Sequence, residues 1–533
     1  MSHAGVCDLA ISDSEPLIHR AVARQAQLRP DATALIERRR PVSYRTLDRA
    51  ASRYASELSA LGIGVGDVVP MLLPRSARLA ALQLAVLKCG AAYAGLDRRW
   101  PAERIAAILG QISPAVVITD SPLGEYPSYQ PPAADLEAVA AACEEQFHPP
   151  ELGGAAPATV FFTSGTTGMP KGVVSPHQAV TRLFRPGGLD GFGPGHATPQ
   201  VAPLPWDMYA FELWGQLTSG GTTVLVEDDH FLPGALRELV RDCGVDTLWI
   251  TTSLFNLFVD EDADCFKGLG QVLTGGEKLS PAHVRAFLRC HPDIPLRNGY
   301  GPAESCMLTT TRLLTLADCD VAGGIPVGTA LAGTTVLVLD ADDQPCPAGE
   351  PGEVCIAGKG LATGYLASPE LTAEKFPTID YGGVPLRIYR TGDVGAFDSA
   401  GVLHFRGRRD RQVKISGHRV EMTEIEATAR GLAGVRDCVA LPLTAPDGQV
   451  VRLALFYLAS TAPDGTAPDG TPPERDANTD PLAVSDQLVR LLPAYAVPAI
   501  VRWLDRFPVT PNGKLDRAEL ARIARTSRRR SAR

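Results

Sequence analysis

A run of glycine, threonine and serine residues that ends near a lysine has the composition of a phosphate-binding loop. It reads TSGTTGMPKG over residues 163–172 and directly follows the apolar segment 159–162. Glycines allow close backbone approach, while hydroxyls, amides and an ammonium can surround phosphate oxygens. It is not a Walker A loop, because Pro170 precedes Lys171 and Gly172 follows it. A polar surface loop is the simpler alternative for a short motif, but ten such residues favour phosphate binding. The residues expected to contact phosphate are Thr163, Ser164, Gly165, Thr166, Thr167, Gly168 and Lys171.

Alternating strand and helix patterns must position this loop. Short β-rich runs alternate with amphipathic helical segments over most of the chain, which is typical of parallel α/β layers. From residue 333 the pattern changes to strands separated by turns. We therefore expect an α/β fold whose large N-terminal domain combines layered α/β subdomains with a β-rich subdomain. The expected strands are 32–37, 68–73, 116–119, 159–162, 222–226, 247–250, 271–273, 335–339, 353–357 and 402–405, and the expected helices are 44–61, 77–88, 232–243 and 281–290.

The last part of the chain, from about residue 411, has the pattern of a small α+β unit. Residues 461–471 repeat the letters TAPDG and form a low-complexity segment, which we expect to be a surface loop without a chemical role. The expected strands of this unit are 412–415, 435–441 and 452–458, and the expected helices are 423–430 and 482–492.

Length and composition exclude several classes of protein. The chain has 533 residues, and because one apolar core stops growing at roughly 250–300 residues, at least two domains are expected. Apolar residues make up 45% and charged residues 21%, which excludes global disorder and a fibrous protein. The net charge of −9 gives no general attraction to nucleic acid or anionic lipid, so neither nucleic acid nor a membrane is an expected partner. The basic end at 528–533 is interpreted as a frayed tail.

The cysteines and the absence of a long apolar run indicate a cytoplasmic protein. The 11 Cys include no Cys-x-x-Cys pair and no Cys/His cluster with zinc spacing, so a reduced cytosol explains them better than a disulfide framework. No signal peptide is apparent at the N-terminus. The uncharged stretch 153–170 is too rich in Gly, Pro and Thr for a membrane helix.

Further motifs follow one another in a fixed order, and together with the loop they carry a resemblance to a known family. The chain resembles the adenylate-forming superfamily, and most closely the amino-acid adenylation domains of nonribosomal peptide synthetases and related stand-alone adenylating enzymes. The resemblance extends over residues 17–517, and a chance match to every motif in order is negligible. The motifs are SYRTL (43–47), LKCGAAY (87–93), WDMYAFE (206–212), NGYGPAE (298–304), GEV (352–354), GYL (364–366), YRTGD (389–393), GRRDRQVK (407–414), LPAY (492–495) and NGKLDR (512–517).

The resemblance implies a two-step reaction that uses ATP and a magnesium ion (Mg2+). A substrate carboxylate attacks the α-phosphate of ATP, which gives an acyl-adenylate and pyrophosphate, and a thiol then displaces AMP. Because the first step gathers anions, a metal and fixed positive groups are natural catalysts. The family pattern assigns Lys514 to the substrate carboxylate and phosphate oxygens, and Glu304 to Mg2+. In isolation, Lys514 would be a solvated lysine in an Asn-Gly turn.

The resemblance also implies how the nucleotide is held. Asp393 is expected to accept both ribose hydroxyls, and Arg408 to support the nucleotide near the ribose. Asn298 and Tyr300, with Gly301 in the same motif, resemble the adenine-recognition residues, one hydrogen bonding and one stacking. The alternatives are that Asp393 caps a turn and that Tyr300 is a core residue.

Asp410 occupies the hinge position of the family. The chain is therefore expected to consist of a large adenylation core, residues 1–409, and a small mobile α+β lid, residues 410–533. The lid is expected to rotate between the two steps, so that Lys514 serves only the first.

Asp207 is the residue that most restricts the range of expected substrates. At the matching position α-amino-acid enzymes carry an aspartate that pairs with the substrate ammonium, whereas enzymes for aryl or fatty acids usually lack it. A helix-start aspartate with a structural role is the alternative. The rest of the implied lining has no charge and no strong hydrogen-bonding side chain, which favours a small or branched aliphatic amino acid such as Ala, Val or Leu. The lining residues, besides Lys514, are Met208, Phe211, Leu254, Leu273, Gly275, Gly299, Met307 and Leu308.

Several functional alternatives remain open. A β-amino acid, as used by stand-alone relatives that prime polyketide assembly, would also fit Asp207. An acid–CoA ligase shares the first step, but Asp207 argues against it, and a non-catalytic scaffold is disfavoured by Lys514, Glu304 and Asp393. No carrier attachment motif follows Arg517, so the expected partner is a separate carrier protein with a phosphopantetheine thiol, and a small activator protein is not excluded.

Overall fold

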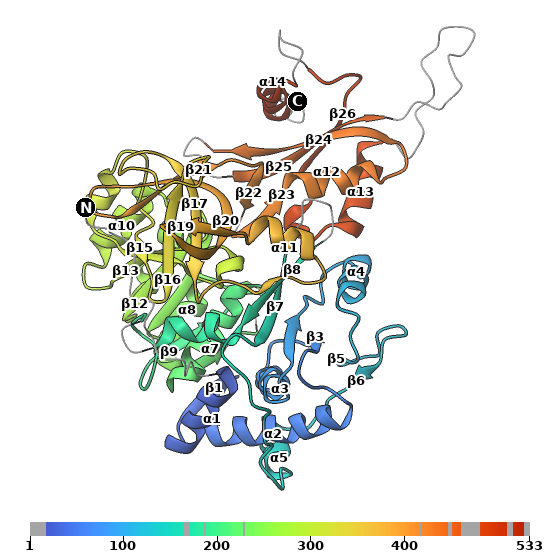
Figure 1. Ribbon diagram of the computed structural model, residues 1–533, viewed down its shortest axis with the longest axis vertical. Helices are drawn as coiled ribbons and strands as arrows, with labels where there is room; N and C mark the ends of the chain where they lie inside the picture. Colours follow the sequence, from blue (N-terminus) through green and yellow to red (C-terminus); the bar gives the residue numbers. More distant parts are fainter. Residues whose placement is uncertain are drawn as a thin grey trace. The chain divides into compact units, whose positions relative to one another are not determined.

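The structure of the chain is a computed structural model with a mixed α/β architecture, and the predicted fold class is confirmed (Figure 1). The chain forms two compact units. The first contains the chain up to Arg98, Leu109–Phe162 and Lys171–Arg409, and the second contains Arg99–Ile108, Thr163–Pro170 and the chain from Asp410. The structure describes residues 17–164, 170–185, 188–227, 230–415, 417–445, 450–459, 480–508 and 515–526. The repeat at 461–471 lies outside them.

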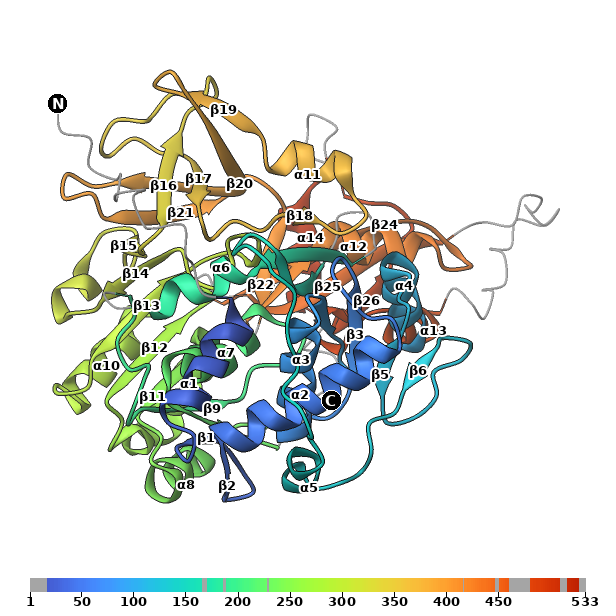
Figure 2. The ribbon, with the colours of Figure 1, turned by 60° about the horizontal axis from the view of Figure 1, so that its bottom comes forward.

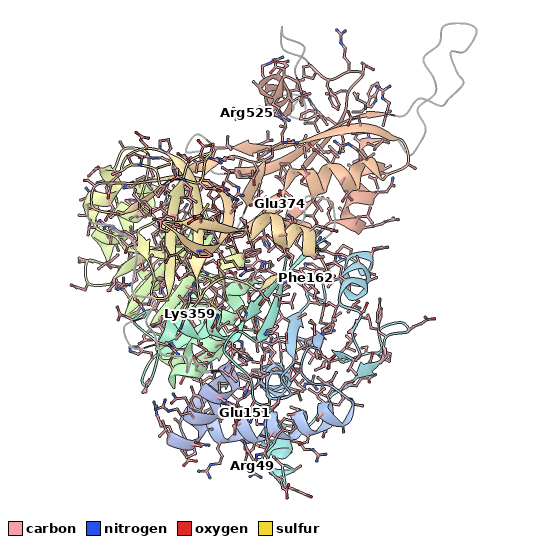
Figure 3. The ribbon with its side chains drawn as sticks, in the orientation of Figure 1. Arg49, Glu151, Phe162, Lys359, Glu374 and Arg525 are labelled. Atoms are coloured by element: carbon pink, nitrogen blue, oxygen red, sulfur yellow. The ribbon has the colours of Figure 1, made fainter. Side chains whose placement is uncertain are left out.

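Two strands of a seven-stranded sheet precede and follow the phosphate-loop motif in the chain. β7 (Pro157–Thr163) ends where the motif begins, and β8 (Lys171–Pro176) follows it. Phe162 of β7, labelled in Figure 3, is buried, and a methyl group on Gly172 of β8 would lie 3.2 Å from its ring. The two strands are therefore closely packed. The sheet order is β18 (Gly364–Tyr365), β8, β7, β4 (Ala92–Gly95), β3 (Val68–Leu72), β5 (Val117–Thr119) and β6 (Ser128–Tyr129).

Two helices that the sequence predicts pack with this sheet. α2 (Tyr44–Ala60) and α3 (Ala77–Lys88) both begin after a serine, and each serine caps its helix. Ser43 accepts the Thr46 N–H at 3.1 Å, and Ser76 accepts the Leu79 N–H at 3.1 Å. Their apolar faces join β3 and β4 in the largest apolar cluster of the described residues.

Two more sheets of the first unit combine parallel and antiparallel strand pairs. One has the order β2 (Arg40–Ser43), β1 (Thr33–Glu37), β10 (Thr222–Leu225) and β9 (Ala197–Gln200). The other has the order β11 (Thr247–Thr251), β12 (Gln271–Gly275), β13 (Leu296–Tyr300), β14 (Thr310–Leu313) and β15 (Thr329–Ala330). Figure 2 shows β11 and β12 next to each other, with α7 nearby. Helices associated with these sheets are α7 (Asp207–Ser219), α8 (Pro233–Cys243), α9 (Thr252–Asp262) and α10 (Pro281–Cys290).

The expected β-rich subdomain is an antiparallel sheet. Alternate residues of β16 and β17 face opposite sides, and one side forms a small apolar cluster with β20. The strands are β16 (Thr334–Leu339), β17 (Gly352–Gly358), β20 (Val384–Phe397), β19 (Thr378–Tyr381) and β21 (Leu403–Arg408). The remaining helices of the first unit are α1 (Ile18–Leu28), α5 (Leu136–Ala141), α6 (His177–Thr181) and α11 (Pro369–Lys375), with 3-10 turns η1 (Arg182–Phe184) and η3 (Ala303–Ser305).

The second unit has its own apolar core between a sheet and two helices. β22 (Gln412–Ile415) and β23 (His418–Glu421) form a hairpin, and β24 (Val435–Thr444) pairs with β25 (Val450–Ala459), which pairs with β26 (Ile500–Trp503). The start of α4 (Ala102–Ile112) belongs to this unit, where Arg104 and Glu424 form a buried ion pair of 2.9 Å. The other helices are α12 (Met422–Arg430), α13 (Pro481–Leu491) and α14 (Arg517–Thr526). Across the ranges that the structure describes, no helix is long and apolar enough to cross a membrane.

Candidate active site

Tyr300, Asp393 and Arg408 form one hydrogen-bonded cluster in the first unit. Asp393 of β20 lies opposite Arg408 of β21 in the strand register, and Tyr300 ends β13. The Tyr300 hydroxyl donates to Asp393 Oδ2 at 2.6 Å, and Arg408 Nη1 donates to Asp393 Oδ1. Arg408 Nη2 also donates to the Thr391 carbonyl at 3.0 Å. Each carboxylate oxygen has a second lone pair, so Asp393 can also accept hydrogen bonds from two ligand hydroxyls.

The protonation state of Tyr300 is fixed by its surroundings. Burial and the negative charge of Asp393 raise the pKa of Tyr300 well above its ordinary value. Tyr300 therefore stays a neutral donor at physiological pH. Because Asp393 is only 5% exposed and is held by two donors, its carboxylate has one defined orientation.

Asn298 and Gly301 lie on either side of Tyr300 in the chain. The Asn298 side chain is buried, and its Nδ2 donates to the Pro326 carbonyl at 2.8 Å. A methyl group on Gly301 would lie 2.9 Å from the Thr309 backbone nitrogen, so no larger residue fits without movement there. The contact of Asn298 with adenine stays a prediction.

Glu304 is fully buried in η3, and its carboxylate has a fixed orientation. The Tyr365 hydroxyl donates to Glu304 Oε1 at 2.8 Å, and the Glu304 carbonyl accepts the Ala362 N–H at 2.8 Å. Within the described ranges, no group of three or more His, Cys, Asp or Glu side chains could hold a metal ion. Magnesium usually binds one or two carboxylates together with phosphates and water, and an oriented glutamate fits that pattern.

Asp207 is the first residue of α7, and its carboxylate contacts a second segment of the chain. Trp206 before it is extended, with φ −90° and ψ 150°. Asp207 Oδ1 accepts the Met208 N–H at 2.9 Å, and Oδ2 accepts the Met307 N–H at 3.0 Å. A carboxylate is favourable at a helix N-terminus. Asp207 therefore has a structural role at the helix start, which was the alternative interpretation. A carboxylate can accept several hydrogen bonds, so the structural role is compatible with binding an ammonium as well.

The turn that Asp207 contacts has an unusual backbone and is held by a buried arginine. Cys306 and Met307 have φ values of 48° and 73°, in the left-handed region that non-glycine residues rarely adopt. Arg182 Nη2 donates to the carbonyls of Ser305 at 3.1 Å and Leu308 at 2.6 Å. No role for Arg182 follows from the family motifs, and an arginine between apolar residues at 179–184 is the only hint in the sequence.

Glu212, on the same helix as Asp207, positions the segment that leads into α7. Its Oε2 accepts the N–H groups of Val201 at 2.9 Å and Ala202 at 2.8 Å. Burial raises the pKa of Glu212 to about 8, while these bonds and Arg75 act in the opposite direction. The motif at 206–212 contains Glu212, but its role becomes visible only in the structure.

The structure brings most of the predicted apolar lining together. Leu254 is the exception, since it packs against a different apolar cluster formed by residues of β11, β12, α9 and α10. Gly275 and Gly299 are partners on neighbouring strands. The lining residues that share the cluster of α2, α3 and α7 are Met208, Phe211, Leu273, Met307 and Leu308.

Trp249 is a further member of this cluster that the motifs do not indicate. It lies on β11 opposite Leu273 of β12, so the two side chains share one face of the sheet. Its ring meets that of Phe211 edge to face, with 6.2 Å between centroids. The predicted strand 247–250 already contained Trp249, but the sequence did not show which face it occupies.

The remaining predicted residues are distributed over the two units or lie outside the described ranges. Ser164, in the second unit, donates through its hydroxyl to the Arg419 carbonyl at 2.7 Å. Asp410 Oδ1 accepts the Gln412 N–H at 3.2 Å in the same unit. Thr163 belongs to the second unit and Lys171 to the first. The residues outside the described ranges are Gly165, Thr166, Thr167, Gly168 and Lys514.

Comparison with known proteins connects this geometry to a family. Residues 22–366 match the family described as AMP-binding enzyme. The chain is 32% identical over 505 residues to tyrocidine synthase 3 of Brevibacillus parabrevis, a match that covers 94% of this chain and 8% of that protein. It is also 32% identical over 516 residues to bacitracin synthase 1 of Bacillus licheniformis, a match that covers 96% of this chain and 9% of that protein. The chain thus spans less than a tenth of the length of these two relatives.

Solved structures are similar over nearly the whole chain. Holo-PA1221, described as an NRPS protein containing adenylation and PCP domains bound to a vinylsulfonamide inhibitor, has a TM-score of 0.85 and 32% identity, and the match covers 96% of this chain and 85% of that chain. The NpsA-ThdA fusion from Klebsiella oxytoca, an adenylation-PCP di-domain, has a TM-score of 0.79 and 26% identity, with 91% and 93% covered. The chain therefore belongs to the AMP-binding enzyme family, and it is similar over nearly its whole length to proteins that are described as containing the adenylation domains of nonribosomal peptide synthesis.

Proposed function

We propose that this enzyme activates a small or branched aliphatic amino acid with ATP and transfers the aminoacyl group to the phosphopantetheine thiol of a separate carrier protein. The observation that carries the proposal is the carboxylate of Asp207 beside the apolar residues Met208, Met307 and Leu308. A partly buried carboxylate of this kind is stabilised by a cationic partner. The ammonium of an amino acid can act as such a partner.

The apolar surroundings of Asp207 support an aliphatic side chain on the proposed substrate. Met208, Met307 and Leu308 are all buried and have no hydrogen-bonding side-chain group suited to a polar ligand. A polar substrate side chain would lose its hydrogen bonds to water here, at a cost of about 1–3 kcal/mol. An aliphatic side chain loses nothing of this kind.

The nucleotide is assigned to the cluster of Tyr300, Asp393 and Arg408. Asp393 is proposed to accept the two ribose hydroxyls with the lone pairs that Tyr300 and Arg408 leave available. Glu304 would hold Mg2+, which supplies charge neutralisation at the phosphates when bound. The loop residues 163–168 and Lys171 are proposed to contact the phosphates, with Asn298 and Gly301 near the base.

The proposed reaction balances as an acyl transfer through a phosphoric anhydride. One carboxylate oxygen of the amino acid forms a bond to the α-phosphorus of ATP, and the bond to the pyrophosphate oxygen breaks. In the second step a thiolate forms a bond to the acyl carbon, and AMP leaves with the oxygen that attacked phosphorus. Lys514 is proposed to stabilise the charge that develops in the first step, and a lid hinged at Asp410 is proposed to remove it for the second.

The proposed partner follows from the relatives. PA1221 and the NpsA-ThdA fusion are described as containing both adenylation and PCP domains. We therefore propose that a carrier protein provides the thiol that accepts the aminoacyl group. The alternative second step is transfer to coenzyme A, as in an acid–CoA ligase.

Amino-acid-dependent exchange of labelled pyrophosphate into ATP tests the proposal. We expect exchange with one or a few of Ala, Val, Leu and Ile, and none without an amino acid. The same exchange assay should include the matching β-amino acids and desamino acids. If a β-amino acid is the preferred substrate, the function assigned to the enzyme becomes the priming of polyketide assembly. Thioester formation with coenzyme A alone, at a rate equal to that with a phosphopantetheinylated carrier, would assign the CoA ligase reaction. No exchange with any carboxylic acid would contradict every form of the proposal.

A further inference from the structure

Arg182 is a buried arginine whose guanidinium donates to backbone carbonyls of two separate segments. It begins η1 and is only 3% exposed. Its Nη2 donates to the carbonyls of Ser305 at 3.1 Å and Leu308 at 2.6 Å, and its Nη1 donates to the carbonyl of Ala179 at 2.5 Å. A planar guanidinium with five fixed N–H groups can serve all three carbonyls at once, which a lysine ammonium cannot do with the same geometry.

A glycine leaves the space that this guanidinium occupies. A methyl group on Gly360 would lie 2.6 Å from both Cζ and Nη2 of Arg182. Atoms do not approach a methyl group so closely, so a larger residue at this position would displace the guanidinium from its carbonyls. A substitution of Gly360 can therefore disturb the hydrogen bonds of Arg182 without changing Arg182 itself.

The turn that Arg182 holds contains two residues in a strained conformation. Cys306 has φ 48° and ψ 92°, and Met307 has φ 73°. Residues other than glycine keep such angles only where the surrounding structure imposes them. The two carbonyls that Arg182 Nη2 binds belong to Ser305 and Leu308, directly before and after the strained pair. Arg182 is therefore placed to impose this conformation.

The same turn presents the N–H group that orients Asp207. The Met307 N–H donates to Asp207 Oδ2 at 3.0 Å, so its direction depends on the backbone angles of the turn. Cys306 lies near both charged side chains. Burial raises the pKa of its thiol to about 12, while the charge of Arg182 lowers this pKa and the charge of Asp207 raises it. The turn thus connects Arg182 to the carboxylate.

We propose that Arg182 is a positioning residue for amino-acid selection, because it keeps the turn at 305–308 in the conformation that orients the Asp207 carboxylate. This inference rests on the proposed function, in which Asp207 pairs with the substrate ammonium. Arg182 acts through the Met307 N–H and has no contact with the substrate. When the turn relaxes, Asp207 keeps its charge but loses one of the two hydrogen bonds that orient it. The ammonium is then held less well, whereas an acid without an amino group is unaffected.

Pyrophosphate exchange with the preferred amino acid and its desamino acid tests the inference. Arg182→Lys keeps the positive charge but not the planar set of donors. It is expected to lower the kcat/KM ratio of amino acid over desamino acid by about 10-fold, which is the usual effect of losing one hydrogen bond to a charged group. An arginine with a purely structural role would lower thermal stability and leave this ratio unchanged.

A glycine in the turn provides a rescue experiment. Glycine adopts positive φ values without strain, so Cys306→Gly is expected to restore most of the ratio when combined with Arg182→Lys. Should Arg182→Lys not fold, Gly360→Ala disturbs the same hydrogen bonds while Arg182 is retained. It is expected to lower the ratio in the same direction, and Cys306→Gly should again restore it.

Arg49→Lys is the matched control. Arg49, labelled in Figure 3, is a partly buried arginine of the same unit that also donates to two backbone carbonyls, those of Ala140 at 3.1 Å and Cys143 at 2.6 Å. Its substitution is expected to lower stability without changing the ratio. An unchanged ratio in the folded Arg182 and Gly360 variants, an equal change in Arg49→Lys, or no restoration by Cys306→Gly would overturn the inference while leaving amino-acid activation intact. Absence of exchange with every amino acid in the wild type would instead contradict the proposed function itself.

Discussion

Replacing Asp207 by asparagine removes a charge while keeping a side-chain oxygen at nearly the same place. The asparagine oxygen can still accept the Met307 N–H, which Asp207 Oδ2 accepts at 3.0 Å, so the turn at 306–307 is expected to stay in place. The substitution therefore separates the two roles of this residue. Its structural role is retained, and its proposed role as counter-ion of the substrate ammonium is lost.

The expected loss follows from Coulomb's law and the partial burial of the site. Two unit charges 4 Å apart attract each other by about 4 kcal/mol at an effective dielectric constant of about 20. Desolvation of Asp207, which is partly buried, offsets some of this and leaves about 3 kcal/mol. With 1.36 kcal/mol per factor of ten, kcat/KM for the preferred amino acid is expected to fall by about 10²-fold.

The assay compares the preferred amino acid with its desamino acid in pyrophosphate exchange. The desamino acid has no ammonium, so its kcat/KM is expected to stay the same or rise in Asp207→Asn. The ratio of the two substrates then changes by about 10²-fold. Asp190→Asn is a suitable control, since Asp190 is an exposed aspartate of the same unit that pairs with Arg297 at 3.0 Å. Equal losses for both substrates, or no loss for either, would refute the assignment of Asp207 to the ammonium.

Three further substitutions or conditions test other parts of the account. Tyr300→Phe removes the 2.6 Å bond to Asp393 and is expected to raise KM for ATP about 5- to 10-fold with little change in kcat, and an unchanged KM would contradict the ribose assignment. Lys514→Ala is expected to lower adenylate formation by about 10²- to 10³-fold without changing thermal stability, and a wild-type exchange rate would contradict its role. Burial lowers the pKa of His19 to about 2 and of His177 to about 3, so both are neutral in the folded state and bind protons near pH 6.5 on unfolding. Their contribution to stability is complete above pH 6.5 and is lost as pH falls towards 3, by about 1.4 kcal/mol per pH unit for each histidine. The free energy of unfolding, measured by chemical denaturation at several pH values, should depend on pH through both histidines in the wild type and in His230→Gln. In His19→Gln only His177 contributes, so this histidine-dependent slope should be about half as steep. Equal slopes in the two variants would contradict the interpretation.

The elements of the fold were predictable because their local patterns agree with their tertiary surroundings. The helix expected at 77–88 is observed as α3 (Ala77–Lys88), and that expected at 281–290 as α10 (Pro281–Cys290). Both begin where the sequence shows a serine, followed directly by a proline in α10. The strand expected at 247–250 is extended by one residue in β11. Such short differences arise because element ends depend on tertiary pairing.

Some strands were not predicted because their residues carry chemistry instead of a strand pattern. β13 (Leu296–Tyr300) contains the motif letters Asn-Gly-Tyr, which resemble a turn. Its pairing with β12 on one side and β14 on the other fixes it as a strand nonetheless. Tertiary hydrogen bonding therefore overrides the local preference here.

The family motifs predicted residues that the structure brings together, but not the residues that hold them in place. Asp393 and Arg408 were both expected, and the structure pairs them directly. Arg182 donates hydrogen bonds to backbone carbonyls, and Glu212 accepts them from backbone N–H groups. Trp249 shares one face of a sheet with Leu273. Such relations depend on strand order and side-chain direction, which sequence spacing does not specify.

The central claim is that a carboxylate oxygen of an amino acid attacks the α-phosphorus of ATP in this enzyme. An amino acid labelled with 18O in its carboxylate, incubated with ATP and a thiol acceptor, tests this claim directly when the AMP is analysed by mass spectrometry. The account predicts one 18O atom in each AMP formed, together with pyrophosphate and no ADP. Unlabelled AMP, or ADP as the nucleotide product, would contradict it.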